Sequence, residues 1–146
     1  MPQVDFHFNV PSRTAYVCRL LRKVVYSGHR VLVLLPADEL DALDTALWAF
    51  SQEDFIAHAR HDAEPLARHA AVLLGTAMPE SHPGGLPPVL LNLLAQVPDA
   101  FHHFDRVLEI VTTDDDDRAQ ARQRWRTYVQ HQIQPNRFDL ATTVAH

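Results

Sequence analysis

The strongest constraint on the fold is an uninterrupted apolar segment, RVLVLLP, at residues 30–36. It is too short for a typical helix, and it lacks the alternation of polar and apolar side chains that marks a strand with one face in water. Strands covered on both faces belong to parallel sheets, because their crossover helices pack on either side. Residues 70–76 and 87–94 have the same character and predict two more buried strands.

Further strands and helices are predicted between and around these segments, from apolar residues at strand or helix spacing. The additional expected strands are residues 4–10, 55–61 and 105–111. The expected helices are residues 12–26, 38 to about 50, 97–104 and 114–132. A short further element is compatible with the segment after Pro135.

Residues suited to helix capping stand at the expected helix ends. Ser12 is the expected N-cap of the first helix, and Gly28 follows its C-terminus in the position that favours glycine. Asp38 is expected to cap the second helix, and Thr112 or Thr113 the last one.

Strands that alternate with helices predict an α/β domain with a mainly parallel, twisted sheet and right-handed crossovers. The length of 146 residues fits one domain, so we expect residues 1–146 to form a single unit. The segment at 77–88 is rich in Pro and Gly and predicts a loop rather than a domain boundary.

Composition excludes several classes of protein. A formal charge of −5 argues against general affinity for nucleic-acid backbone, although it is compatible with a local basic patch. The single cysteine, Cys18, excludes an internal disulfide and a cysteine-based zinc site. With no leader pattern and no run of about 18 apolar residues, we expect a soluble protein of the reducing cytoplasm.

Motifs for nucleotides and metals are missing from the sequence. The first expected strand is followed by NVPSRTAY, which has no glycine to bring the backbone close to a phosphate. His58, His61, Asp62 and Glu64 are close in sequence, but they match no known zinc spacing, so surface histidines are the simpler interpretation. We therefore predict no cofactor and no metal.

Catalytic motifs are also missing. Cys18 falls inside an expected helix, and no serine lies in a G-x-S-x-G context. The four aspartates at 114–117 fall at the start of the last helix, where the helix dipole favours anions, and are read as a solvated terminus. No catalytic residue is predicted, and an enzyme is not expected.

The last helix has the most specific geometry. Arg118, Arg122 and Arg126 are spaced by four and form one row, with Trp125 beside them. Such a row suits an acidic peptide that ends in an apolar side chain and a carboxylate. The alternative is a solvated charged face with the tryptophan in the core.

Two aromatic residues in LDALDTALWAFSQEDFIAHA, residues 40–59, also allow two interpretations, core packing or partner binding. Leu40, Leu43 and Leu47 suffice to anchor the expected helix on a sheet. Trp48 and Phe55 are therefore either additional core or a docking surface.

The chain resembles the chi subunit of bacterial DNA polymerase III over nearly its full length. The resemblance is carried by SGHRVLVL leading into LDALDTALWAFSQEDFIAHA, by VLLNL and FDRVLEIV, and by ARQRWRTYVQ. It implies a three-layer, Rossmann-like α/β fold without nucleotide binding, cofactor or catalysis. The implied function is that of an adaptor in the clamp-loader complex, at the nucleoid-associated replisome.

The resemblance also implies one partner for the last helix. That partner is the acidic C-terminal tail of single-stranded DNA-binding protein, and DNA itself is contacted only indirectly. The matching positions are Val111, Arg118, Arg122, Trp125 and Arg126. Arg118 and Arg126 stand where lysine is usual, and Trp125 stands where tyrosine is usual, so charge and aromatic character are kept.

A second partner is implied for Trp48 and Phe55. In the family this surface binds the psi subunit, which joins chi to the clamp loader, or in some bacteria a helicase-like alternative partner. The proline usual soon after the tryptophan is replaced here by Phe50 and Ser51.

Two other functions compete with the adaptor. One is a small α/β enzyme or nucleotide-binding protein with an atypical site, against which the missing glycine-rich turn counts. The other is direct binding of single-stranded DNA by the arginines and Trp125, which the net charge and the four aspartates oppose.

Overall fold

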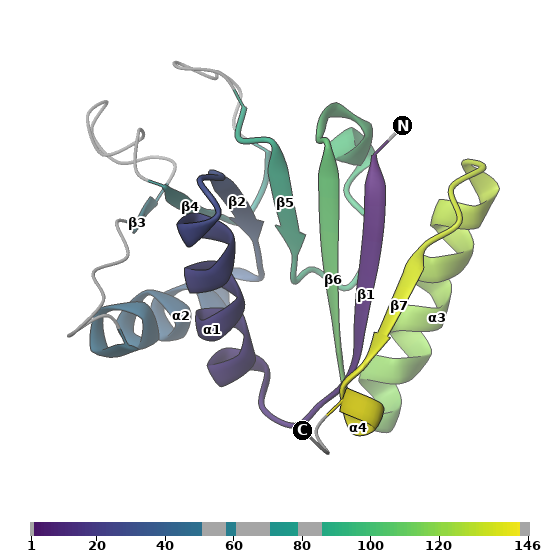
Figure 1. Cartoon of the computed structure of the whole chain (residues 1–146), viewed down its shortest axis with the longest axis horizontal. Helices are drawn as coiled ribbons and strands as arrows, with labels where there is room; N and C mark the ends of the chain where they lie inside the picture. The colour runs from purple at the N-terminus through teal and green to yellow at the C-terminus, as the bar shows by residue number, and fades with distance from the viewer. Residues whose placement is uncertain (1, 51–57, 61–70, 79–85, 144–146) are drawn as a thin grey trace.

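The computed structural model describes residues 2–50, 58–60, 71–78 and 86–143 (Figure 1). Its strands are β1 (Gln3–Val10), β2 (Val31–Leu34), β3 (His58–Arg60), β4 (Val72–Gly75), β5 (Val89–Asn92), β6 (Arg106–Thr112) and β7 (Asn136–Asp139). Its helices are α1 (Arg13–Tyr26), α2 (Ala37–Phe50), the 3-10 helix η2 (Asp99–His103), α3 (Asp115–Gln130) and α4 (Leu140–Thr143).

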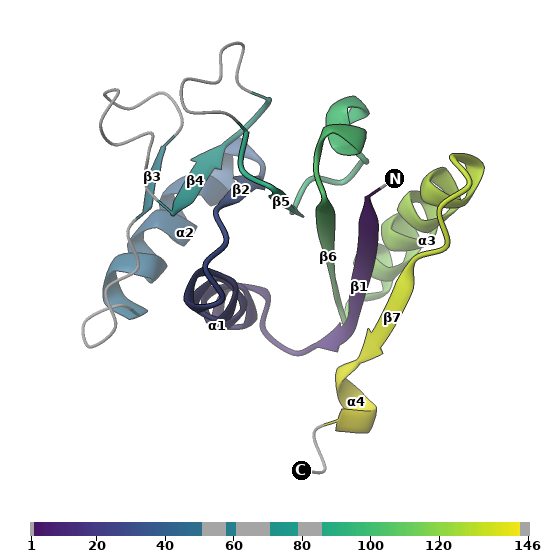
Figure 2. The same ribbon diagram turned by 45° about the horizontal axis from the view of Figure 1, so that its top comes forward.

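The described strands form one seven-stranded sheet in the order β3-β4-β2-β5-β6-β1-β7, and every neighbouring pair is parallel. The predicted α/β class with a parallel, twisted sheet is confirmed. The connection through α1 carries the chain from β1 past β6 and β5 to β2. Figures 1 and 2 show α2 near β3 and β4 at one end of the sheet, and α3 near β1 and β7 at the other.

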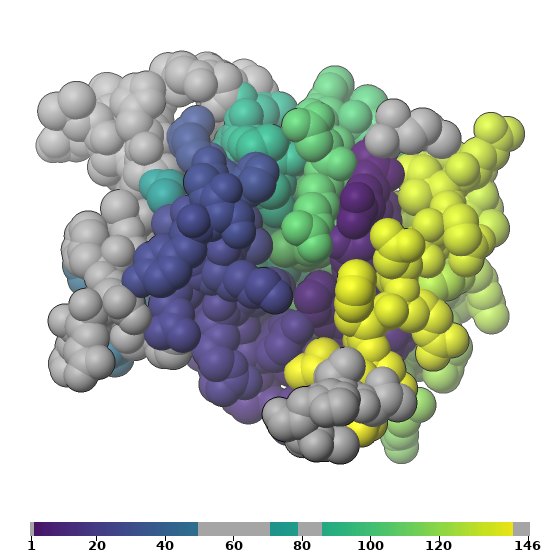
Figure 3. Space-filling model, viewed as in Figure 1, coloured from purple at the N-terminus to yellow at the C-terminus, as the bar shows by residue number. Residues whose placement is uncertain are grey.

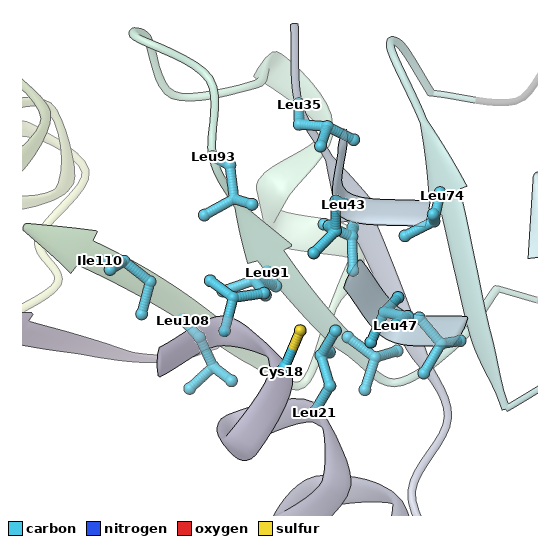
Figure 4. Close-up of a cluster of buried hydrophobic side chains, with 14 of the residues drawn as sticks. Cys18, Leu21, Leu35, Leu43, Leu47, Leu74, Leu91, Leu93, Leu108 and Ile110 are labelled. Atoms are coloured by element: carbon cyan, nitrogen blue, oxygen red, sulfur yellow. The ribbon is translucent and has the colours of Figure 1, made fainter. Parts of the chain in front are cut away.

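Helices cover both faces of the sheet. On one face, Cys18 and Leu21 of α1 and Leu47 of α2 pack on the central strands (Figure 4). On the other face, Tyr128 of α3 packs with Phe6 of β1. All four residues of β2 are buried, as predicted for a strand covered on both sides. In Figure 3, α1 lies across the near face, and β7 and α4 lie to its right, in front of α3.

The ends of α1 and α2 agree only in part with the predicted caps. Ser12 is at the N-cap of α1, but its side chain makes no capping hydrogen bond. Gly28 follows the helix with φ +87°, a conformation that glycine adopts without steric cost. The prediction for Asp38 is wrong, because α2 already begins at Ala37 and Asp38 lies in its first turn.

The cap of α3 is neither of the two predicted threonines, Thr112 and Thr113, but Asp114. The Asp114 carboxylate accepts a hydrogen bond of 3.0 Å from the Asp117 N–H. The Asp117 carboxylate in turn accepts from the backbone N–H and the hydroxyl of Thr112, at 2.8 and 2.9 Å. Two of the four aspartates thus close the turn from β6 into α3 instead of being merely solvated.

The remaining elements lie where the sequence predicts them, but some differ in type or in where they end. The helix expected at 97–104 is the 3-10 helix η2, and the last helix ends at Gln130, two residues early. Of the extended segment expected at 55–61, residues 58–60 form β3 and the others lie outside the described residues. The segment after Pro135 forms both β7 and α4.

A buried polar network attaches α3 to the sheet. Glu109 of β6 accepts hydrogen bonds from Arg124 Nε at 2.8 Å, Tyr128 Oη at 2.7 Å and Asn92 Nδ2 at 2.9 Å. Burial raises the pKa of Glu109, against the influence of Arg124 and the other donors. Burial and the neighbouring carboxylate likewise raise the pKa of Tyr128, which therefore stays a donor.

A second buried carboxylate, Asp5 of β1, joins three strands on the opposite face. It accepts from Arg106 Nε of β6 at 2.8 Å, from Asn136 Nδ2 of β7 at 2.9 Å and from Gln3 Nε2 at 3.2 Å. Burial alone raises the pKa of Asp5, but the hydrogen bonds from Asn136, Gln3 and Arg106 outweigh it and lower the pKa. Asp5 also lies opposite Asn136 in the register, so the bond holds β7 in place.

We expect Arg124→Met to reduce the free energy of unfolding by about 3–5 kcal/mol, because Glu109 would remain buried without its cation. Urea denaturation checks this. Arg122→Met is the matched control on the exposed side of the same helix, and it should change stability by less than about 0.5 kcal/mol. Equal losses in both variants would contradict a special role for the buried pair.

We expect Asp5→Asn to remove an acid-sensitive part of the stability. A carboxylate with a lowered folded pKa stabilises fully above its unfolded value of 3.8, and this contribution is lost as pH falls toward the folded pKa. The difference in unfolding free energy between wild type and variant should therefore shrink below pH 3.8. Urea titrations over a pH series measure it, with exposed Asp105→Asn as the control; a pH-independent difference would count against this account.

Candidate functional site

A pocket of about 490 Å³ opens between α3 and the carboxyl ends of β1, β6 and β7. All five residues of the predicted last-helix site line it: Val111, Arg118, Arg122, Trp125 and Arg126. We call it the arginine pocket. Its volume falls in the range of roughly 300–1,000 Å³ that small ligands and peptide ends occupy.

The lining of the arginine pocket is strongly cationic. Arg118, Arg122 and Arg126 are exposed on one row of α3, and Arg137 of β7 adds a fourth guanidinium. With Asp139, the described residues of the lining carry four positive charges and one negative, a formal charge of +3. In a chain with a net charge of −5, this local excess would attract an anionic ligand.

The aromatic rings of Trp125 and Phe8 contribute to the apolar part of the pocket. The centroid of the Trp125 ring lies 5.0 Å from that of Phe6 and 6.2 Å from that of Phe8. Trp125 is only partly buried, so it packs on the core and lines the pocket at once, and its role in peptide binding stays a prediction. The Arg137 guanidinium lies 5.0 Å from the centroid of the Phe8 ring, a cation–π distance.

A β-bulge at the end of β1 shapes one side of the pocket. His7 lies opposite Ile110 and Val10 opposite Thr112, so two residues of β1, Phe8 and Asn9, face the single residue Val111 of β6. Asn9 has φ +60°, in the left-handed region that asparagine tolerates better than most residues.

The bulged Asn9 anchors the acidic member of the lining. Its Nδ2 donates to Asp139 Oδ1 at 2.7 Å, and the same oxygen accepts from the Ala141 N–H at 2.9 Å. The hydrogen bond from Asn9 has the largest effect on the pKa of Asp139, and the one from Ala141 has the next largest. Both lower this pKa. The carboxylate is therefore ionised and fixed at the start of α4.

The sequence predictions missed the other six described residues of the pocket lining, which come from α3 and β6 as well as from β1 and β7. They are Phe8, Asn9, Thr112, Ala121, Arg137 and Asp139. The alternation of residues 4–10 could have placed Phe8 on the face of Phe6, but nothing local indicates that β7 pairs with β1.

Trp48 is 53% exposed near the end of α2. Its predicted partner in the second surface, Phe55, lies outside the described residues. Because α2 and α3 pack on opposite faces, and near opposite ends of the strand order, Trp48 is remote from the arginine pocket (Figures 1 and 2).

An ion pair occupies the crevice in which Rossmann-like folds usually bind nucleotides. At the carboxyl ends of β2 and β5, Arg13 Nη1 lies 3.4 Å from Glu39 Oε1, and the Arg13 guanidinium also donates to the Leu93 carbonyl. The space beside them is about 150 Å³, well below the roughly 300 Å³ at which small-molecule sites begin.

The described part of the chain holds no group of three or more His, Cys, Asp or Glu arranged for a metal ion. Of the histidine-rich segment His58, His61, Asp62 and Glu64, only His58 is described. None of the described helices combines the length and apolarity needed to cross a bilayer.

Two comparisons with known proteins agree. Residues 1–136 match the family model of the DNA polymerase III chi subunit, HolC. The DNA polymerase III subunit chi of Pseudomonas aeruginosa is 37% identical over 137 residues, covering 88% of this chain and 89% of that protein. Chi is an accessory, non-catalytic subunit that serves DNA replication. The chain therefore belongs to the DNA polymerase III chi subunit family.

Proposed function

We propose that this chain is an adaptor that binds two partners at two separate surfaces. The arginine pocket takes the acidic C-terminal tail of single-stranded DNA-binding protein, and the Trp48 surface takes the psi subunit of the clamp loader. The observation that supports the first assignment best is the convergence of four arginines from α3 and β7 around the rings of Trp125 and Phe8.

The pocket offers each chemical group that such a tail needs. Guanidinium forks bind carboxylates with two parallel hydrogen bonds, which suits acidic side chains and a terminal carboxylate. The faces of Trp125 and Phe8, with buried Val111 and Ala121, offer apolar contact for the last side chain. The interaction is exposed to solvent and electrostatic, so we expect micromolar affinity that falls with salt.

The assignment of psi to the second surface is supported by the match of residues 40–59 to the family pattern and by the exposure of Trp48. Exposed tryptophans are frequent anchors of protein interfaces. The wide separation of the Trp48 surface from the arginine pocket would leave both free to act at once, which an adaptor requires.

We expect Arg122→Ala to weaken tail binding more than any other substitution of the α3 row, because Arg122 is the central member of the row. Isothermal titration calorimetry with a short acidic peptide ending in an apolar residue and a free carboxylate measures this. Arg19→Ala, an exposed arginine of α1, is the control. Unchanged affinity in Arg122→Ala would remove the tail-site assignment.

Psi binding should depend on the other surface alone. Trp48→Ala should reduce binding of purified psi in a pull-down but leave the calorimetric affinity for the acidic peptide unchanged, and Arg122→Ala should do the reverse. Tyr26→Ala, another exposed aromatic residue at the end of α1, controls for a general loss of apolar surface. Loss of both partners in Trp48→Ala would contradict two independent sites.

A further inference from the structure

The edge strand β7 forms one wall of the arginine pocket. Arg137 and Asp139 are two residues apart, so they lie on the same face of the strand, and both line the pocket. In the register they lie opposite Phe6 and Phe8 of β1. This wall therefore carries one cation and one anion, while the charged α3 residues that line the pocket are all cations.

The first of these residues, Arg137, is positioned to contact a bound peptide. Its guanidinium lies over the Phe8 ring at 5.0 Å, and its side chain belongs to β7 while the other arginines of the lining belong to α3. A peptide in the pocket would thus meet cations from both sides. Stacking on the ring also restricts the guanidinium before binding, which reduces the entropy lost on binding.

The second residue, Asp139, is expected to oppose the binding of an acidic peptide. It is the one acidic side chain among the described residues of the lining, its charge acts on Arg137 and Arg118, and hydrogen bonds from Asn9 and Ala141 hold its carboxylate in place. A ligand carboxylate near this end of the pocket would be repelled.

We propose that β7 determines the specificity of the arginine pocket, with Arg137 as a further peptide-binding residue and Asp139 as a residue that limits affinity for negative charge. This proposal rests on the proposed function of the pocket as an acidic-tail site. Asp139 partly offsets Arg137 and Arg118, so the strongest attraction lies around Arg122 and Arg126.

Two substitutions with opposite expected effects test the proposal. Arg137→Gln should weaken binding of the acidic peptide about two- to fivefold, and Asp139→Asn should strengthen it by a similar factor. Asparagine at 139 keeps an oxygen to accept from Asn9 and Ala141, so the variant removes the charge without removing these two hydrogen bonds. Fluorescence anisotropy with the labelled peptide at low and high salt measures both affinities, and both effects should shrink with added salt.

Arg19→Gln and Asp105→Asn, exposed and outside the pocket, are the charge-matched controls. Damage to β7 would weaken binding in both test variants, so opposite signs, absent from the controls, support the proposal. Unchanged affinities, or changes of the same sign, overturn it while the wild type still binds the peptide. A wild type that binds no acidic peptide overturns the proposed function as well.

Discussion

The ion pair between Glu109 and Arg124 decides how α3 sits on the sheet. The buried side of this helix holds few apolar residues, and its described buried members are Ala121, Arg124 and Tyr128. Two of these three donate to the same carboxylate of β6. Positions two apart on a helix point roughly 200° from each other, so burying Arg124 turns Arg122 and Arg126 outward. The buried pair of Glu109 and Arg124 thus fixes the rotation of α3 about its own axis, and this rotation exposes the arginine row.

Local patterns in the sequence were sufficient for most of the fold. The apolar runs around Val33, Leu74 and Leu91 predicted the central strands, because burial on both faces leaves a continuous signature. Helix caps were harder to predict, since several adjacent polar residues can each perform the role. At the start of α3 the choice between threonine and aspartate depended on the turn from β6, in which the Asp117 carboxylate binds the backbone of Thr112.

The α3 residues and the β7 residues of the candidate site also differed in how well the sequence predicted them. The α3 arginines were found from a four-residue spacing, which is a property of one helix. The β7 residues were not, because β7 has no buried residue and its neighbour in the sheet is β1. The hydrogen bond that holds it, from Asn136 to Asp5, spans 131 positions of the sequence. Such a partnership has no local signature, and only the assembled sheet brings Arg137 to the α3 row.

The bulge at Phe8 and Asn9 also changes the face of the sheet to which the last side chain of β1 points. Val4 and Phe6 belong to the core under α3, and strict alternation would send Val10 to the same side. Because the bulge adds one residue, Val10 instead packs in the core beneath α1 and α2. One strand therefore contributes side chains to both hydrophobic cores. The chain also leaves β1 already directed toward the face on which its next helix, α1, must pack.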